Sequence, residues 1–153
     1  DLKKRWKPPI PKGGEFPIST EVGDQGPFDL WEDRLLYVDE ATNSTYIYNL
    51  TTGERKIIEN DSEVEGIRIW EDYVALVRYE KNEDIIHSAL YLYDITTDEK
   101  RLIYEEQGPI PEGLKTFSFI SHVEMGDGVL VWMGGGYTSK AEWLVMDLHY
   151  TRI

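Results

Sequence analysis

The sequence predicts an all-β fold made of β-propeller blades. Three observations indicate this fold: an internal repeat of about forty residues, short segments rich in β-branched and aromatic residues, and turn-forming residues between those segments. A period of about forty residues is the size of one four-stranded propeller blade. We therefore expect three four-stranded antiparallel blades that form part of a larger ring.

Two phrases carry the repeat. The first consists of an apolar segment, an acidic tight turn and a second apolar segment; it occupies residues 29–38, 68–77 and, more loosely, 123–132. The second begins with Tyr-x-Tyr followed by Asn or Asp, and it occupies residues 46–58 and 91–103. Residues 144–151 begin the second phrase a third time, which places Asp147 where the preceding copy has Asp94.

The middle segment of each repeat is apolar on both faces instead of alternating between apolar and polar residues. These segments are Leu35–Val38, Val74–Val77 and Val129–Met133. Such runs are typical of strands in a sheet that is covered on both sides. We expect them to be the most buried stretches, each near the middle of a sheet, with no helix longer than a short turn between Phe28 and Leu148.

Turn-forming sequences separate these strands. Thr-Thr-Gly-Glu at 51–54 and Thr-Thr-Asp-Glu at 96–99 supply positions that tolerate positive φ, and Asp127-Gly128 is a strong two-residue turn signal. The outermost strands carry basic residues that would protect an exposed edge from pairing with other chains. These residues are Arg55, Lys56, Lys100 and Arg101.

With the strands of a blade named a to d from the ring axis outward, the chain is predicted to follow the order d-abcd-abcd-abc. Blade 1 is expected at about residues 27–59, blade 2 at about 66–105 and blade 3 at about 116–153. Residues 1–14 are interpreted as an N-terminal arm or linker, and residues 15–153 as the propeller segment.

An orphan outer strand precedes the first blade. Residues 16–19, with Phe16 and Ile18, precede residues 28–31 at the spacing by which 55–58 precede 67–70. Blade 3 lacks an outer strand, so residues 16–19 are predicted to close it. Three blades cannot form a ring, since propellers have roughly 4–8. The rest comes from self-association, from a protein partner, or from a longer ring of which this chain is a part.

The repeat resembles TolB-type propeller repeats, especially those of archaeal and bacterial cell-surface proteins. The phrases Trp-Glu-Asp-Arg-Leu-Leu-Tyr-Val-Asp at 31–39 and Tyr-Ile-Tyr-Asn-Leu-Thr-Thr-Gly-Glu at 46–54 carry the resemblance, which covers about residues 16–153. It implies a propeller fold, and it is compatible with surface-layer proteins, periplasmic scaffolds and the gating domains of serine peptidases.

Charge excludes some partners. The chain has 16 Lys and Arg against 29 Asp and Glu, a formal net charge of -13, which disfavours nucleic acid and anionic membranes. There is no apolar run of the roughly 20 residues that a membrane span needs. Cysteine is absent, so disulfides and thiolate chemistry are excluded.

Three of the four asparagines lie in N-glycosylation sequons: Asn43, Asn49 and Asn60. This frequency favours an extracellular or cell-surface glycoprotein, with the periplasm as the alternative. Each asparagine also lies where a turn is expected, so turn formation alone could account for it.

No catalytic, metal or cofactor site is predicted. The three histidines lack metal-ligand spacing, there is no Gly-x-Ser-x-Gly elbow, and Gly134–Gly136 are interpreted as a flexible hairpin. The acidic pairs at 32–33 and 71–72 are interpreted as solvated turns. The tryptophans are assigned to blade packing, with a carbohydrate platform as the alternative.

These features favour a non-enzymatic binding or assembly module. The alternative is the substrate-gating propeller of a serine peptidase, or part of a propeller glycosidase. Its interaction face is expected on the longer loops at 21–27, 40–44, 60–65, 80–87, 105–115 and 134–140, with Lys81, His87 and Tyr137 as candidate contact residues.

Overall fold

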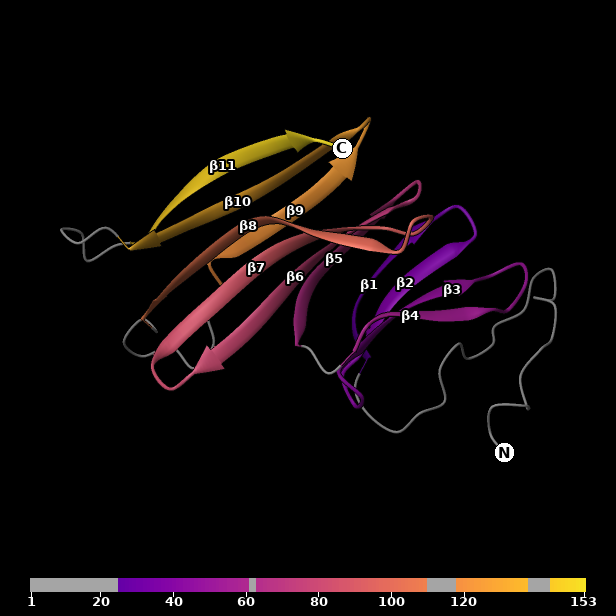
Figure 1. The fold of residues 1–153 in the computed structure, drawn as a ribbon, viewed down its shortest axis with the longest axis horizontal. Helices are drawn as coiled ribbons and strands as arrows, with labels where there is room; N and C mark the ends of the chain where they lie inside the picture. The colour runs from indigo at the N-terminus through magenta and orange to yellow at the C-terminus, as the bar shows by residue number, and fades with distance from the viewer. Residues whose placement is uncertain (1–24, 61–62, 110–117, 138–143) are drawn as a thin grey trace.

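A computed structural model describes residues 25–60, 63–109, 118–137 and 144–153 (Figure 1). Every regular element in these ranges is a β-strand, and none is a helix, which confirms the all-β prediction. The predicted outer strand with Phe16 and Ile18 and the predicted arm at 1–14 lie outside the described residues.

The described residues form eleven strands in three antiparallel sheets, each a meander of neighbouring strands. The first sheet contains β1(Gln25–Trp31), β2(Arg34–Asp39), β3(Ser44–Asn49) and β4(Arg55–Glu59). The second contains β5(Val64–Trp70), β6(Tyr73–Asn82), β7(Ile85–Asp94) and β8(Glu99–Pro109). The third contains β9(Ile120–Gly126), β10(Val129–Tyr137) and β11(Leu144–Arg152).

The second sheet lies between the other two (Figure 1). Its first strand, β5, contacts β1 of the first sheet and β9 of the third. On β6, Val74 and Leu76 pack in the core shared with the first sheet, whereas Ala75 and Val77 pack in the core shared with the third. Because β6 is covered on both faces, the prediction that Val74–Val77 is fully buried is confirmed.

In β2 of the first sheet, Leu36–Val38 are also buried and Leu35 is half-buried, whereas β10 of the third sheet is covered more on one face. In β10, Leu130 and Trp132 are buried against the second sheet, while Val129, Val131 and Met133 are only half-buried. The prediction of a uniformly buried stretch at Val129–Met133 is therefore wrong. The described residues provide no further layer on the outer face of this sheet.

One backbone hydrogen bond recurs in all three sheets. The amide N–H groups of Leu50, Ile95 and Ile153 donate to the carbonyl oxygens of Asp33, Asp72 and Gly128, at 2.7, 2.8 and 2.9 Å. This recurrence aligns the three sheets residue by residue, with Ile153 at the position of Leu50 and Ile95.

The alignment corrects the predicted third copy of the second phrase. Asp147 does not take the position of Asp94; it lies within β11, opposite Gly134. The residue at the position of Asp94 is Arg152, which pairs with Val129 as Asp94 pairs with Tyr73. The similarity in sequence predicted the wrong register. The register of β11 is determined by its pairing with β10 and not by its composition.

The predicted turns have the expected conformations. The Asn49 side-chain oxygen accepts hydrogen bonds from the backbone N–H groups of Thr51 and Thr52, both at 2.8 Å. Asp94 accepts from Thr96 and Thr97 in the same way. Positive φ occurs at the expected positions, namely Gly53, Asp98, Asp127 and Gly128.

Three segments predicted as loops are strands instead. Residues 80–82 and 85–87 extend the β6–β7 hairpin, residues 105–109 end β8, and residues 134–137 end β10. The expected flexible glycine hairpin is thus a paired strand. Gly134 is buried, and a Cβ there would lie 2.7 Å from Cε1 of Tyr104. Glycine is required at this position because the Tyr104 ring occupies the space of a side chain.

We predict that Gly134→Ala lowers the free energy of unfolding by about 1–3 kcal/mol, the usual range for overpacking. The Tyr104 ring cannot easily move, since it contacts Trp132 and His149 at centroid distances of 5.8 and 4.9 Å. Gly126→Ala is the control, because a Cβ at Gly126 meets no atom within 4 Å. Urea denaturation of both variants measures the difference, and equal stability would contradict this packing.

Candidate interaction surfaces

The candidate contact residues do not form one patch. Lys81 is exposed and pairs with Ile86, while the neighbouring residue Glu80 pairs with His87, so Lys81 and His87 lie on opposite faces of the second sheet. The His87 Nε2 atom lies 3.0 Å from Oε2 of Glu105. Tyr137 ends β10 in the third sheet, opposite Leu144.

The three sequon asparagines lie at strand ends in the first sheet. Asn43 is exposed, with a φ of 48°, in the turn between β2 and β3. Asn49 ends β3 and uses its side-chain oxygen in the turn described above. Asn60 is exposed after β4, and its side-chain oxygen accepts a hydrogen bond from the Ser44 hydroxyl at 2.8 Å.

A row of charged residues connects the first strands of the three sheets. Asp29, Arg68 and Glu124 occupy the same repeat position on β1, β5 and β9. The Arg68 guanidinium donates two hydrogen bonds to the Glu124 carboxylate, both at 3.1 Å. Asp29 Oδ2 accepts a hydrogen bond from the Ile69 backbone N–H at 2.9 Å.

The contacts within this row shift the pKa values of Glu124 and Arg68 in opposite directions. The hydrogen bonds from Arg68 lower the pKa of Glu124, and the same contacts raise the pKa of Arg68, with a further contribution from Asp29. These residues were missed in the sequence. The signal was a charge at one repeat position, Asp29, Arg68 and Glu124, between two apolar positions of the first strand.

Two lysines connect the outer strands of the first and second sheets. Lys100 Nζ lies 2.6 Å from Oε2 of Glu59, a buried carboxylate. Lys56 Nζ lies 3.0 Å from Oδ1 of Asp98 and 5.5 Å from the Tyr93 ring centroid. Hydrogen bonding to Tyr93 and then to Asp98 raises the pKa of Lys56. Both lysines, predicted to protect an edge, thus hold two sheets together.

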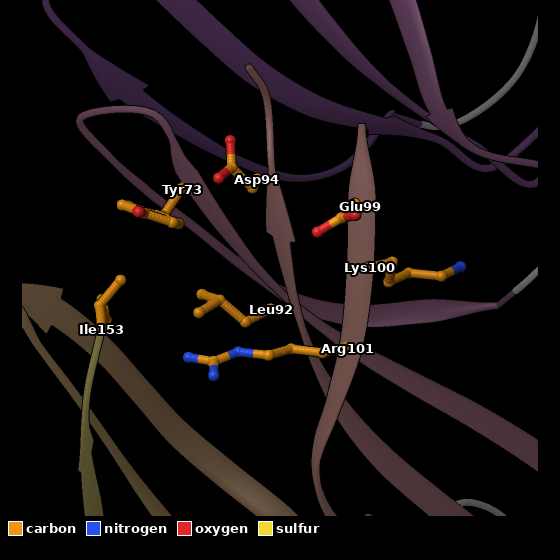
Figure 2. A pocket seen from close by; sticks show the side chains of 7 residues that line it. All are labelled: Tyr73, Leu92, Asp94, Glu99, Lys100, Arg101 and Ile153. Atoms are coloured by element: carbon orange, nitrogen blue, oxygen red, sulfur yellow. The ribbon is translucent and has the colours of Figure 1, made fainter. Parts of the chain in front are cut away.

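A cavity of about 610 Å³ lies between the second sheet and the end of β11 (Figure 2). In Figure 2 the Arg101 side chain extends toward Ile153, whereas the Lys100 side chain points away from it. The cavity is lined by Tyr73, Leu92, Asp94, Glu99, Lys100, Arg101 and Ile153.

The end sheets expose apolar side chains at positions that are buried in the interior. Leu148 and Tyr150 on β11 are 74% and 77% exposed, but the residues at the same positions on β7, Leu90 and Leu92, are 0% and 3% exposed.

The first sheet shows the same contrast on its opposite face. Phe28 and Leu30 are 73% and 54% exposed, whereas the equivalent Ile67 and Ile69 on β5 are 1% and 4% exposed. The third sheet at β11 and the first sheet at β1 are thus exposed at positions that are covered in the second sheet, whereas β2 and β3 bury their outer face in a separate cluster of Tyr37, Tyr46 and Tyr48.

Two further findings concern the described ranges. No three acidic or histidine side chains there lie together as a group that could hold a metal ion. No described element is a helix of the length and apolarity needed to cross a membrane.

Comparison with family models, with curated proteins and with solved structures gave no match to this chain. The surfaces of the molecule itself are therefore the basis for proposing its function.

We predict that Glu124→Gln lowers the free energy of unfolding at pH 7 by less than about 1 kcal/mol, because the ion pair is largely exposed. Since the folded-state pKa of Glu124 is depressed, its contribution is present above the unfolded value of 4.5 and is lost as the pH falls through the folded value. The difference from the parent chain should therefore shrink below pH 4.5.

Urea denaturation at several pH values measures this difference. Glu71→Gln is the control, because Glu71 is an exposed glutamate in the β5–β6 turn. A stability loss for Glu124→Gln that stays constant down to pH 2 would contradict a role for its charge.

Proposed function

We propose that the three sheets are consecutive blades of a TolB-type β-propeller, and that the chain is a non-enzymatic binding or assembly module of an extracellular or cell-surface protein. The observation that carries this proposal is the contrast between Leu148 and Tyr150, which are exposed, and their buried counterparts Leu90 and Leu92. Apolar side chains that are exposed on β1 at one end of the array and on β11 at the other end call for further blades.

The contacts between sheets support the same arrangement. The first strands β1, β5 and β9 lie next to one another, as the strands around a propeller axis do. The recurring hydrogen bond at Leu50, Ile95 and Ile153 supports the treatment of each sheet as one repeat unit.

The two end faces match each other. The face of the third sheet with Leu148 and Tyr150 corresponds to the second-sheet face that packs against β9 and β10. The face of the first sheet with Phe28 and Leu30 corresponds to the second-sheet face that packs against the first sheet. A second copy can therefore stack its first sheet on the third sheet of the first copy, and two copies would make six blades.

In such a ring the β6–β7 and β10–β11 hairpins would supply an interaction face. Strands β6 and β7 have ten residues each, whereas β2 and β3 have six, so the hairpin of the second sheet is the longer. Lys81 and His87 lie on this hairpin, and Tyr137 lies at the corresponding end of β10. A rigid ring with such hairpins suits recognition of another protein or of a carbohydrate.

We predict that the chain forms a dimer of twice its 17.8 kDa mass in light scattering. Tyr150→Asp should weaken this dimer by about tenfold or more, equal to about 1.4 kcal/mol, because it places a charge in an apolar blade interface. Ile85→Asp is the matched control: Ile85 is also an exposed large apolar residue, but it lies at a hairpin tip.

A parent chain that stays at 17.8 kDa would exclude completion of the ring by a second copy. A dimer that is equally sensitive to Tyr150→Asp and to Ile85→Asp would exclude the β11 face as the interface.

We predict that the protein from its native source carries N-linked glycans at Asn43 and Asn60, which are both exposed. Treatment with a peptide N-glycosidase should lower the mass and convert each modified asparagine to aspartate, which mass spectrometry detects. Asn49→Asp removes the third sequon and keeps the turn, since Asp94 forms the same turn in the second sheet. An unchanged mass after treatment would contradict the glycoprotein assignment.

A further inference from the structure

Tryptophan occupies one repeat position in the first two sheets, and glycine occupies it in the third. Trp31 ends β1, Trp70 ends β5 and Gly126 ends β9, each two residues before the residue whose carbonyl oxygen accepts the recurring hydrogen bond. We propose that the space at Gly126, beside Trp70, binds one ring of a neutral carbohydrate. This site lies at the opposite end of β6 from the β6–β7 hairpin, and it does not depend on completion of the ring.

The first interface shows how a side chain at this position is used. The indole rings of Trp31 and Trp70 make an edge-to-face contact, with their centroids 6.2 Å apart. This distance is within the range of favourable aromatic pairs. A ring on the first sheet thus lies against the ring of the next sheet, and a ring at Gly126 would extend this row to the third sheet.

Trp70 faces the third sheet. It pairs directly with Tyr73 on β6, and residues that lie opposite each other in an antiparallel pair have their side chains on the same face. Tyr73 packs against the core shared with the third sheet, and it lines the cavity at that interface (Figure 2). Trp70 is only half-buried, so part of it is accessible to a ligand.

Gly126 leaves an open space at the facing position. A Cβ at Gly126 would meet no atom within 4 Å, whereas a Cβ at Gly134 on β10 would lie 2.7 Å from the Tyr104 ring. Gly128 has a positive φ of 73°, but Gly126 does not. Neither the backbone conformation nor a close neighbour requires glycine at position 126. The effect of this glycine is to keep the space beside Trp70 open.

An exposed ion pair borders this space. Arg68 lies two residues before Trp70, and it pairs with Ala75 of the core shared with the third sheet, so it lies on the same face as Trp70. Its guanidinium donates to Glu124, which lies two residues before Gly126. Two residues of a strand span roughly 7 Å. The ion pair is therefore within reach of the hydroxyl groups of a ring that stacks on Trp70.

A sugar ring matches this combination of groups. Its C–H groups form an apolar face that stacks on an indole ring, and its hydroxyl groups can donate to a carboxylate and accept from a guanidinium. A planar aromatic ligand would leave the ion pair unused. An anionic ligand would be repelled by Glu124, by the neighbouring Asp127 and by the net charge of -13. The carbohydrate is therefore a neutral one.

The test is isothermal titration calorimetry of the full chain with neutral oligosaccharides of cellulose, chitin and mannan. We expect saturable binding of at least one of them. Gly126→Trp should weaken this binding by about tenfold or more, because the new indole ring fills the space beside Trp70. Ile57→Trp is the matched control, since it adds the same ring at an exposed position of β4 in the first sheet. Absence of binding, or equal binding by the two variants, would overturn the site.

Glu124→Gln tests the polar part of the site in the same assay. The variant remains folded, because its ion pair is largely exposed, and it should bind the oligosaccharide about threefold or more weakly, because a charge-assisted hydrogen bond becomes a neutral one. An acidic oligosaccharide from pectin is the negative probe and should not bind. Unchanged affinity in Glu124→Gln, or binding of the pectin oligosaccharide as tight as that of the neutral ones, would overturn the assignment to a neutral sugar.

Discussion

Burial of both faces of β6 is the constraint on which the other features depend. A strand with apolar side chains on both faces must be shielded from water on both faces. Val74 and Leu76 therefore need one neighbouring sheet, and Ala75 and Val77 need another. At roughly 25 cal/mol per Å² of apolar area, this two-sided burial is the main stabilising contribution in the middle of the molecule. The first and third sheets cover the two faces of β6. Each of them in turn exposes apolar side chains on its own outer face.

Polar contacts orient the stacked sheets. Apolar burial alone would let the sheets slide, because it is non-directional. Arg68 and Glu124 set the position of β9 against β5, and Lys100 with Glu59 sets β8 against β4. The Lys100–Glu59 pair has the greater consequence, since Glu59 is buried and loss of the lysine charge would remove one of the interactions that compensate its desolvation.

Much of this architecture could be predicted from the repeat. Segments 35–38 and 74–77 were identified as central strands because a two-sided apolar pattern is typical of a covered sheet, and the turns at Gly53 and Asp98 followed from residues that tolerate positive φ. The register of β11 could not be predicted, because it depends on pairing with β10 across a segment whose letters resemble another part of the repeat. The prediction of a flexible hairpin at Gly134 was wrong for a similar reason. Glycine in a sequence is typical of flexible turns, whereas here the absence of a side chain leaves space for the Tyr104 ring. The row through Arg68 was missed because each member is a single ordinary charge until the sheets are stacked.

Each sheet is a meander, and sheets touch through neighbouring layers, so the molecule behaves as a short one-dimensional array. Contacts within a sheet are local in sequence, which favours rapid formation of individual hairpins. A single sheet gains little until a second one covers it, so cooperativity resides in the interfaces and not in the strands. Amide protons of β6, covered on both faces, should then exchange more slowly than those of β1 or β11, and the opening of the molecule should proceed inward from its two ends.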